Sequence, residues 1–254
     1  MTGELSSRAF FEQLSEPFSA EAVFDFMPDT VFFVKDHDGR YVSVNQTLVD
    51  RCGLRTRSQL LGRRPSDVLG KTLGAGYELQ DQVVLETGQK LIDQLELHTV
   101  GGRDVGWCLT TKMPLFGRGG GIAGLVGISR DLQLPDISSD DFAHISAAIR
   151  FTEQNMSQRP TNAKLADIAS MSVYQLDRRM RRVFGLTTGQ WVLKTRISHA
   201  SRLLIETDLS VADVALAAGY ADQSAFTRQF RRSTGLSPSA HRRLRQLSSK
   251  TRML

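Results

Sequence analysis

The chain has 254 residues, of which 41% are hydrophobic and 23% are charged. This length and composition are typical of about two compact globular domains. Its two cysteines, Cys52 and Cys108, are too few for a disulfide framework or a tetrahedral metal site, so we expect no metal. No apolar run approaches the roughly 18 residues of a membrane span, and the first ten residues lack the pattern of a signal peptide. We therefore expect a cytoplasmic protein without a membrane partner.

The charge is divided unevenly along the chain. Residues 1–135 hold 14 Lys and Arg against 17 Asp and Glu, a net charge of −3, whereas residues 136–254 hold 18 against 10, a net charge of +8. A basic second half beside a mildly acidic first half indicates that the second half contacts a polyanion.

The first half begins with a predicted helix within residues 1–21, on which Phe10, Leu14 and Phe18 recur every four residues. Segments rich in β-branched and aromatic residues, separated by glycine turns, are predicted to be strands at 31–45, 91–99, 103–116 and 121–132. Residues 45–88 carry Leu and Val at helical intervals instead. Two strands, several helices and then three strands predict an α+β domain, a five-stranded antiparallel sheet with helices against one face.

A linker follows in the segment LQLPDISSDD at 132–141, after which the strand-like alternation stops. We place the linker at 134–139, between a domain at 22–133 and a helical domain at 140–245, with a tail at 246–254.

The helical half contains an internal repeat: RRMRRVFGLT at 178–187 and RQFRRSTGLS at 228–237 are nearly the same phrase. Each copy opens with a hydroxyl residue at the N-cap, continues as a short Ala-rich helix, turns, and enters a second helix that ends at glycine. This pattern predicts two helix-turn-helix motifs. A predicted helix of about 18 residues at 188–207, about 27 Å long, joins them. Two recognition helices held at that separation would suit successive major-groove segments, about 34 Å apart, of double-stranded DNA.

The second copy carries a resemblance to a known family. RLLIETDLSVADVALAAGYADQSAFTRQFRRSTGLSPSAHRR at 202–243 resembles the DNA-binding domain of the AraC family of transcription regulators. NAKLADIASMSVYQLDRRMRRVFGLTTGQWV at 162–192 resembles its first motif, with departures at Asn162 and at Ser170, which stands where the family has the turn glycine. The resemblance implies a regulator that binds promoter or operator DNA, with RNA polymerase as a further partner.

The same resemblance implies which side chains read bases near the start of each second helix. These are Tyr174, Gln175, Arg178, Arg179, Gln223, Ser224, Thr227 and Arg228. Arg can bind guanine and Gln can bind adenine through paired hydrogen bonds, and Thr or Tyr can contact a thymine methyl group. The arginine pairs that follow either contact phosphates or form only a solvated basic face. They are Arg181, Arg182, Arg231 and Arg232.

Residues 22–133 resemble a PAS sensor domain. The resemblance rests on FFVKDHDGRYVSVNQ at 32–46, on TTKMPL at 110–115, and on the closing GLVGISRDL at 124–132. It implies a domain that senses a small molecule, pairs subunits, or does both beside an output domain. We expect a homodimer formed through the N-terminal half, with the stripe of Phe10, Leu14 and Phe18 packed across it.

The sequence leaves the effector of this domain open, and no cofactor is predicted. Cys52 follows VDR rather than the Asn-Cys-Arg motif of light-sensing PAS domains, and residues 75–88 lack the histidine of haem-binding relatives. We interpret His98 as an exposed strand histidine. Two alternatives remain: an unknown organic effector, or a domain that only dimerises or binds a protein partner. By strand alternation, the candidate cavity wall is Trp107, Leu109 and Thr111.

No enzyme is expected. PSDVLGKT at 65–72 ends like a phosphate-binding loop, but Pro65 stands in place of the required first glycine. GRGGG at 117–121 lies between two strands and is better interpreted as a hairpin loop. A DNA-repair module would require a cysteine nucleophile in a zinc-bound or His-paired setting, and Cys108 lies in the middle of a predicted strand.

Overall fold

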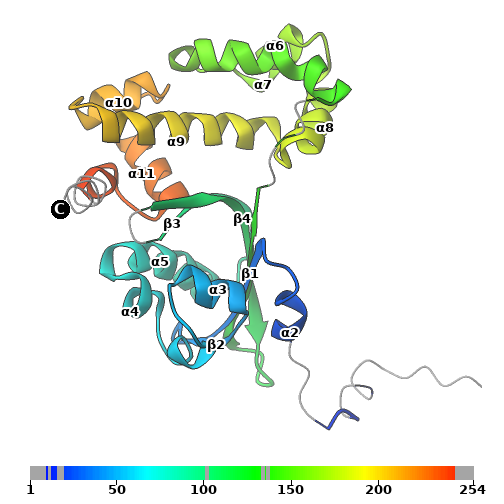
Figure 1. Ribbon diagram of the computed structural model, residues 1–254, viewed down its shortest axis with the longest axis vertical. Helices are drawn as coiled ribbons and strands as arrows, with labels where there is room; N and C mark the ends of the chain where they lie inside the picture. The colour runs from blue at the N-terminus through cyan, green and yellow to red at the C-terminus, as the bar shows by residue number, and fades with distance from the viewer. Residues whose placement is uncertain are drawn as a thin grey trace, which may run out of the picture.

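The computed structural model of the protein (Figure 1) describes residues 10, 13–15, 20–100, 103–132, 135 and 138–243. The predicted N-terminal helix lies mostly outside the described residues, Phe18 included, and Phe10 and Leu14 are both exposed. The first helix with described bounds is α2, Glu21–Phe24. Among the described helices, none has both the length and the apolar character that a membrane crossing requires.

The first domain is built on five antiparallel strands in the order β2-β1-β5-β4-β3. The strands are β1 Thr30–Asp36, β2 Tyr41–Val44, β3 Leu91–Val100, β4 Arg103–Phe116 and β5 Ile122–Asp131. Between the two edge strands β2 and β3, the chain forms the helices that cover one face of the sheet (Figure 1). They are α3 Gln46–Arg51, the 3₁₀ helix η1 Arg57–Gln59, α4 Pro65–Leu69 and α5 Lys71–Thr87. The predicted α+β domain with helices against one face is confirmed.

Alternation along the strands explains the apolar cluster on this face of the sheet. Val31 and Phe33 on β1 point the same way, and they are buried in one cluster with Leu125 of β5. Leu48 of α3 and Val84 of α5 close this cluster from the helical side. Burial of such side chains stabilises the domain by roughly 1.5 to 3 kcal/mol each.

The second domain is helical throughout its described length and contains the predicted repeat. Its elements are α6 Asp140–Gln154, the 3₁₀ helix η2 Met156–Gln158, α7 Asn162–Ile168, α8 Val173–Phe184, α9 Thr188–Glu206, α10 Val211–Ala217 and α11 Gln223–Thr234. The pairs α7–α8 and α10–α11 are the two helix-turn-helix motifs, and the 19-residue α9 joins them (Figure 1). The hydroxyls of Thr161 and Ser210 cap the first helix of each pair, and α8 and α11 both end at a left-handed glycine. The predicted all-α fold class is confirmed.

The turn of each motif contains one residue with a left-handed backbone conformation, but the space around that residue differs between the two motifs. Ser170 in the first turn has φ 53° and Gly219 in the second has φ 79°. A Cβ atom on Gly219 would lie 2.3 Å from the carbonyl oxygen of Met156, which no real contact tolerates. The second turn therefore requires glycine for space as well as for φ, whereas the first accommodates the serine side chain.

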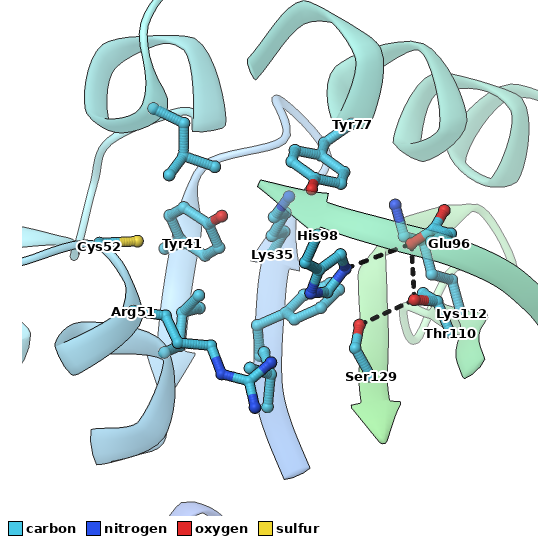
Figure 2. Close-up of a pocket in the computed structure, with 14 residues that line it drawn as sticks. Lys35, Tyr41, Arg51, Cys52, Tyr77, Glu96, His98, Thr110, Lys112 and Ser129 are labelled. Carbon is cyan, nitrogen blue, oxygen red and sulfur yellow. Dashed lines mark hydrogen bonds and ion pairs between the residues drawn. The ribbon is translucent and has the colours of Figure 1, made fainter. Parts of the chain in front are cut away.

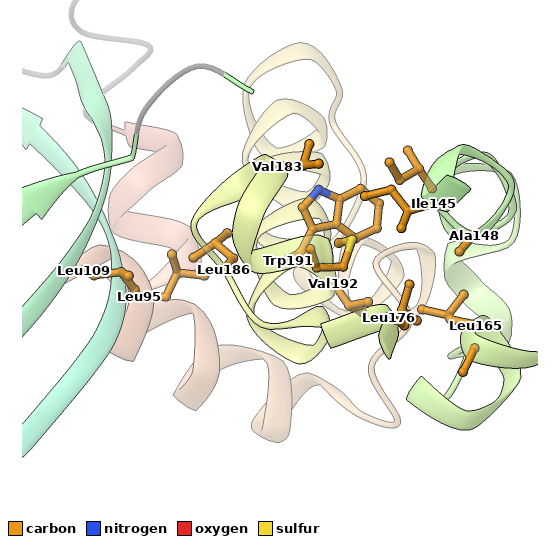
Figure 3. Close-up of a cluster of buried hydrophobic side chains, with 13 residues drawn as sticks. Leu95, Leu109, Ile145, Ala148, Leu165, Leu176, Val183, Leu186, Trp191 and Val192 are labelled. Carbon is orange, nitrogen blue, oxygen red and sulfur yellow. The ribbon is translucent and has the colours of Figure 1, made fainter. Parts of the chain in front are cut away.

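The two domains pack against each other through strands β4 and β3, at one edge of the sheet. Leu95 of β3 and Leu109 of β4 share a buried cluster with Leu186, which follows α8 (Figure 3). The indole nitrogen of Trp107 donates to the Ser198 hydroxyl at 3.1 Å. On α5, Gly76 lies so close to the end of α11 that a Cβ atom there would be 2.6 Å from the carbonyl oxygen of Gly235. The apolar outer side of β3 and β4 is thus an interface between the domains.

Candidate nucleic-acid interface and internal cavity

Helix α8 turns an apolar face inward and leaves two of the predicted base-reading side chains open to solvent. Leu176 and Met180 are buried, while Tyr174 is 75% exposed and Arg178 is exposed. The guanidinium of Arg178 makes no hydrogen bond or ion pair with another described residue. Both side chains are therefore free to meet a ligand from outside.

The other two predicted readers on α8 already have partners. Gln175 Oε1 accepts a hydrogen bond from the Ser172 backbone at 2.9 Å, which completes the capping box at the helix start. Arg179 Nε lies 3.2 Å from an Asp141 carboxylate oxygen, and its Nη1 lies 3.6 Å from the Met171 sulfur. Arg179 is thus held against the domain, and Gln175, although exposed, must give up its capping hydrogen bond to bind a base through both of its polar atoms.

Helix α11 repeats the arrangement of α8. Its N-cap is Asp222, which accepts from the Ala225 backbone at 2.8 Å. Phe226 and Phe230 are fully buried in the core of the second motif. The predicted readers lie on the remaining faces: Gln223, Ser224 and Arg228 are exposed, and Thr227 is half-buried.

The arginine pairs that follow the readers differ between the motifs. In the first motif Arg181 lies 3.6 Å from Asp177 and Arg182 lies 3.2 Å from Asp141 of α6. In the second motif Arg231 and Arg232 are both exposed, and Arg232 Nε also donates to Oε1 of Gln94 on β3 at 2.8 Å. The sequence could not distinguish these roles, because the partners lie 41 and 138 residues away.

The first domain contains a cavity of about 60 Å³ between the inner face of the sheet and the covering helices (Figure 2). Its lining is Val31, Phe33, Lys35, Tyr41, Leu48, Arg51, Cys52, Leu69, Tyr77, Glu96, His98, Thr110, Lys112 and Ser129. Nine of these carry polar or charged side-chain nitrogen or oxygen atoms, which is unusual for a domain interior.

Two lysines and one aspartate form a buried charged group beside this cavity. Lys35 Nζ lies 2.5 Å and Lys112 Nζ 2.7 Å from the two oxygens of Asp81 on α5, and all three side chains are 2% exposed. Burial would raise the pKa of Asp81, but the charges of Lys112 and Lys35 outweigh it and lower that pKa. Burial lowers the pKa of Lys35 despite the opposing effect of Asp81.

A second polar network crosses from β3 to β5. Thr110 Oγ1 lies 2.6 Å from Glu96 Oε2 and 2.9 Å from the Ser129 hydroxyl, and His98 Nε2 lies 3.5 Å from Glu96 Oε2 (Figure 2). Cys108 Sγ is 3.2 Å from His98 Nε2. Burial alone would lower the pKa of His98, but Cys108 and Glu96 outweigh it and raise that pKa to about 10.

These positions correct two sequence interpretations. His98 is not an exposed strand histidine, because it points into the cavity and its side chain is only 14% exposed. Trp107, Leu109 and Thr111 share one strand face as predicted, but that face is turned away from the cavity, which Thr110 and Lys112 line instead. Trp107 and Leu109 contact the helical domain instead. The predicted alternation of side chains along β4 is correct, but the face assigned to the cavity is the opposite one.

Cys108 has the histidine partner that the sequence did not indicate. Its side chain is nevertheless fully buried on the face of the sheet that carries His98 and Thr110, so the thiol is closed to a DNA substrate in this structure. Cys52 also borders the cavity, and burial raises the pKa of its thiol to about 11.

Comparison with known proteins identifies both domains. Residues 24–134 match the family model of the PAS fold, and residues 165–244 match that of a helix-turn-helix domain. The transcriptional activator NphR of Rhodococcus is 40% identical over 97 residues, which are 37% of this chain and 28% of that protein. The melibiose operon regulatory protein of Escherichia coli is 32% identical over 108 residues, 42% of this chain and 36% of that protein.

The chain thus spans about a third of the length of the curated relatives it matches. Among solved structures, the DNA-binding domain of AdpA in complex with a target DNA is 30% identical, covers 42% of this chain and 96% of that chain, and has a TM-score of 0.40. The chain joins a PAS domain to an AraC-type helix-turn-helix domain, and the resemblance drawn from the sequence is confirmed.

Proposed function

We propose that the protein is a sequence-specific DNA-binding transcriptional regulator in which α8 and α11 read successive major-groove segments. The observation that carries this proposal is the equivalent placement of Arg178 and Arg228. Each lies in the first half of the second helix of its motif, and each is exposed. An arginine at that place can bind the O6 and N7 atoms of guanine.

The long helix between the motifs supports a two-site mode of binding. At 1.5 Å per residue, the 19 residues of α9 extend about 28 Å. That length approaches the roughly 34 Å between major-groove segments on one side of B-DNA. We propose Tyr174, Arg178, Gln223, Ser224 and Arg228 as the main base contacts. Gln175, Arg179 and Thr227 stay secondary candidates because they are capped, paired or half-buried.

For the PAS domain we favour a sensory role, because its cavity holds charges that a purely structural core avoids. Burial of Lys35, Asp81, Lys112 and Glu96 costs solvation free energy that their ion pairs and hydrogen bonds must offset, and such buried charged groups cluster at functional sites. The cavity of about 60 Å³ is far below the roughly 300 Å³ of typical organic-ligand sites. A larger effector would have to displace a covering helix, while a small polar or ionic one would fit.

A signal from the cavity has a direct route to the second motif. Glu96 and His98 line the cavity from β3, and Gln94 on the same strand holds Arg232 of α11. An effector can change DNA affinity only if it binds one arrangement of β3 and α11 more tightly than another. Contact between the bound regulator and RNA polymerase stays a prediction of the family resemblance.

The alternative role of the PAS domain, dimerisation, also has support. Three apolar residues at and after α2 are exposed: Val23, Phe26, which is 88% exposed, and Met27. Large apolar side chains exposed close together in the chain are typical of subunit contacts. We propose a homodimer through the N-terminal half, and sensing and dimerisation are compatible. Sedimentation of the full chain tests the dimer, since Phe26→Ser should lower its association constant. A wild-type chain that stays monomeric at high concentration would refute it.

Selection of binding sites from a random DNA pool tests the main proposal. Arg178→Ala and Arg228→Ala should each make the free energy of binding to the selected site less favourable by about 1 to 3 kcal/mol. Each variant should also lose the preference for a particular base at one position of the site, and the two positions should lie about one helical turn apart. Arg118→Ala is the matched control, because it removes the same charge from the turn between β4 and β5. If both variants lost base preference at the same position, or neither lost it at any position, the proposal that two helices read separate segments would be contradicted.

A further inference from the structure

Three potential metal ligands of different chemistry meet beside the cavity. Glu96 and His98 are two residues apart on β3 and therefore project from the same face of the strand. Cys108 lies directly opposite Glu96 in the register of β3 and β4. One ligand atom from each side chain lies within 4.8 Å of the other two. We propose that these three residues bind one divalent transition-metal ion of the zinc type.

The distances suit a tetrahedral ion without movement of the backbone. With Zn–S near 2.3 Å and Zn–N and Zn–O near 2.0 to 2.2 Å, ligand atoms around tetrahedral zinc lie about 3.3 to 3.6 Å apart. Here Cys108 Sγ is 3.2 Å and Glu96 Oε2 is 3.5 Å from His98 Nε2. Cys108 Sγ and the Glu96 carboxylate lie within 4.8 Å of each other, so rotation of these side chains would have to bring them to the tetrahedral spacing.

The donor atoms select the class of metal. A thiolate, an imidazole and a carboxylate together favour zinc or a similar late transition metal. Magnesium and calcium require mostly oxygen ligands, six or more for calcium, which this cluster does not offer. Three protein ligands leave one position of a tetrahedron open, as in zinc sites that also bind water or a small ligand. Glu96 and His98 border the cavity, so that position would face it.

Neighbouring side chains already orient the ligands. Thr110 Oγ1 donates to Glu96 Oε2 at 2.6 Å, and Gln80 Nε2 donates to Glu96 Oε1 at 2.5 Å. The ring of Tyr77 packs edge-on against His98, with 5.8 Å between ring centroids. Such outer contacts fix ligand orientation in metal sites and strengthen metal binding. The sequence expectation of no metal rested on counting cysteines and missed a mixed ligand set whose members come from two paired strands.

Metal binding here also has a regulatory consequence, which rests on the proposed function. Gln94, the partner of Arg232, is two residues from Glu96 on β3. An ion that fixes Glu96 and His98 therefore restrains the strand that holds α11. We expect the metal-loaded and metal-free chains to differ in operator affinity.

Cobalt titration of the full chain, after dialysis against a chelator, tests the site without reference to DNA. Co²⁺ should produce thiolate-to-metal charge-transfer absorption that saturates at one ion per chain and disappears when Zn²⁺ is added. Cys108→Ser should abolish the absorption, and His98→Ala should weaken Co²⁺ binding by more than about tenfold. Cys52→Ser is the matched control, since it removes the other cavity thiol and should leave the absorption unchanged.

The outcomes separate this proposal from the proposed function. Absence of the charge-transfer absorption in the wild-type chain, its survival in Cys108→Ser, or its loss in Cys52→Ser would each overturn the metal site. Circular dichroism of each variant shows whether it is folded, and the wild-type titration decides the question even where a variant is not. Co²⁺ binding in a chain that selects no DNA would refute the proposed regulator and leave the metal site standing.

Discussion

Arg232 at the end of α11 donates from Nε to the side-chain oxygen of Gln94 on β3 at 2.8 Å, a hydrogen bond between the two domains. The equivalent residue of the first motif, Arg182, instead lies 3.2 Å from Asp141 of α6, inside its own domain. One position of the repeat therefore ties α8 to the helical domain and α11 to the PAS domain. The position of α11 thus depends on the sheet.

We expect Gln94→Ala and Arg232→Ala to destabilise the contact between β3 and α11 by similar amounts, about 1 to 2 kcal/mol each, because the hydrogen bond involves a charged donor. The double variant should lose little more than either single variant, since both remove the same bond. Urea unfolding, followed by the fluorescence of Trp107 and Trp191, measures the free energy of unfolding of the wild type, both single variants and the double variant. Trp107 lies in the interface itself. Full additivity of the two losses would show that the bond does not form in solution.

The neighbouring arginines of α11 should differ in their contribution to DNA binding. Arg231 is exposed, so its guanidinium can contact a phosphate and release a counterion. Arg231→Ala should weaken all DNA sequences alike and reduce the slope of log K against log salt by about one unit. Arg232→Ala should change that slope less, because its Nε is already bound to Gln94. Fluorescence anisotropy at several salt concentrations measures both, and equal slopes for the two variants would contradict the distinction.

Local pattern was sufficient to predict the elements of this fold. Period-two segments bounded by glycine predicted the strands, and the hydroxyl caps at Thr161 and Ser210 with glycines at 185 and 235 predicted the helix-turn-helix pairs. These signals lie within a few residues of one another and act through the backbone. The predicted boundaries at 133 and 140 lie close to the end of β5 and the start of α6.

The cavity could not be predicted in the same way, because alternation along β4 gives two faces and does not say which is covered by helices. Trp107 and Leu109 looked like a cavity wall because they are large and apolar, yet they meet the second domain. Asp81 meets Lys35 and Lys112 across 46 and 31 residues of sequence, and no local pattern marks such pairs. Tertiary contacts alone bring these charges together.

The turn glycine of the second motif should be hard to replace. Gly219→Ala adds a Cβ atom 2.3 Å from the carbonyl oxygen of Met156, on top of the roughly 1 to 2 kcal/mol that a left-handed alanine costs. Gly185→Ala is the matched control: its φ is 68°, and nothing lies within 4 Å of the added atom. Urea unfolding should show a clearly larger loss for Gly219→Ala. Equal losses would mean that the close approach of Met156 relaxes at no cost.

The ion group of Asp81 with Lys35 and Lys112 predicts a pH dependence of stability. The folded pKa of Asp81 lies below its ordinary value of 3.8, so its contribution to the free energy of unfolding is present above that pH and is lost as the pH falls through the folded pKa. Asp81→Asn leaves two buried lysines with reduced compensation and should cost about 3 to 5 kcal/mol near pH 7. The difference from wild type should shrink on acidification below about pH 4, where the carboxylate of the unfolded wild-type chain takes up a proton while that of the folded chain stays charged. Urea unfolding at pH 7 and pH 3 measures this, with the exposed Asp38→Asn as control. A cost of Asp81→Asn that is the same at both pH values would show that the charge of Asp81 does not stabilise the fold.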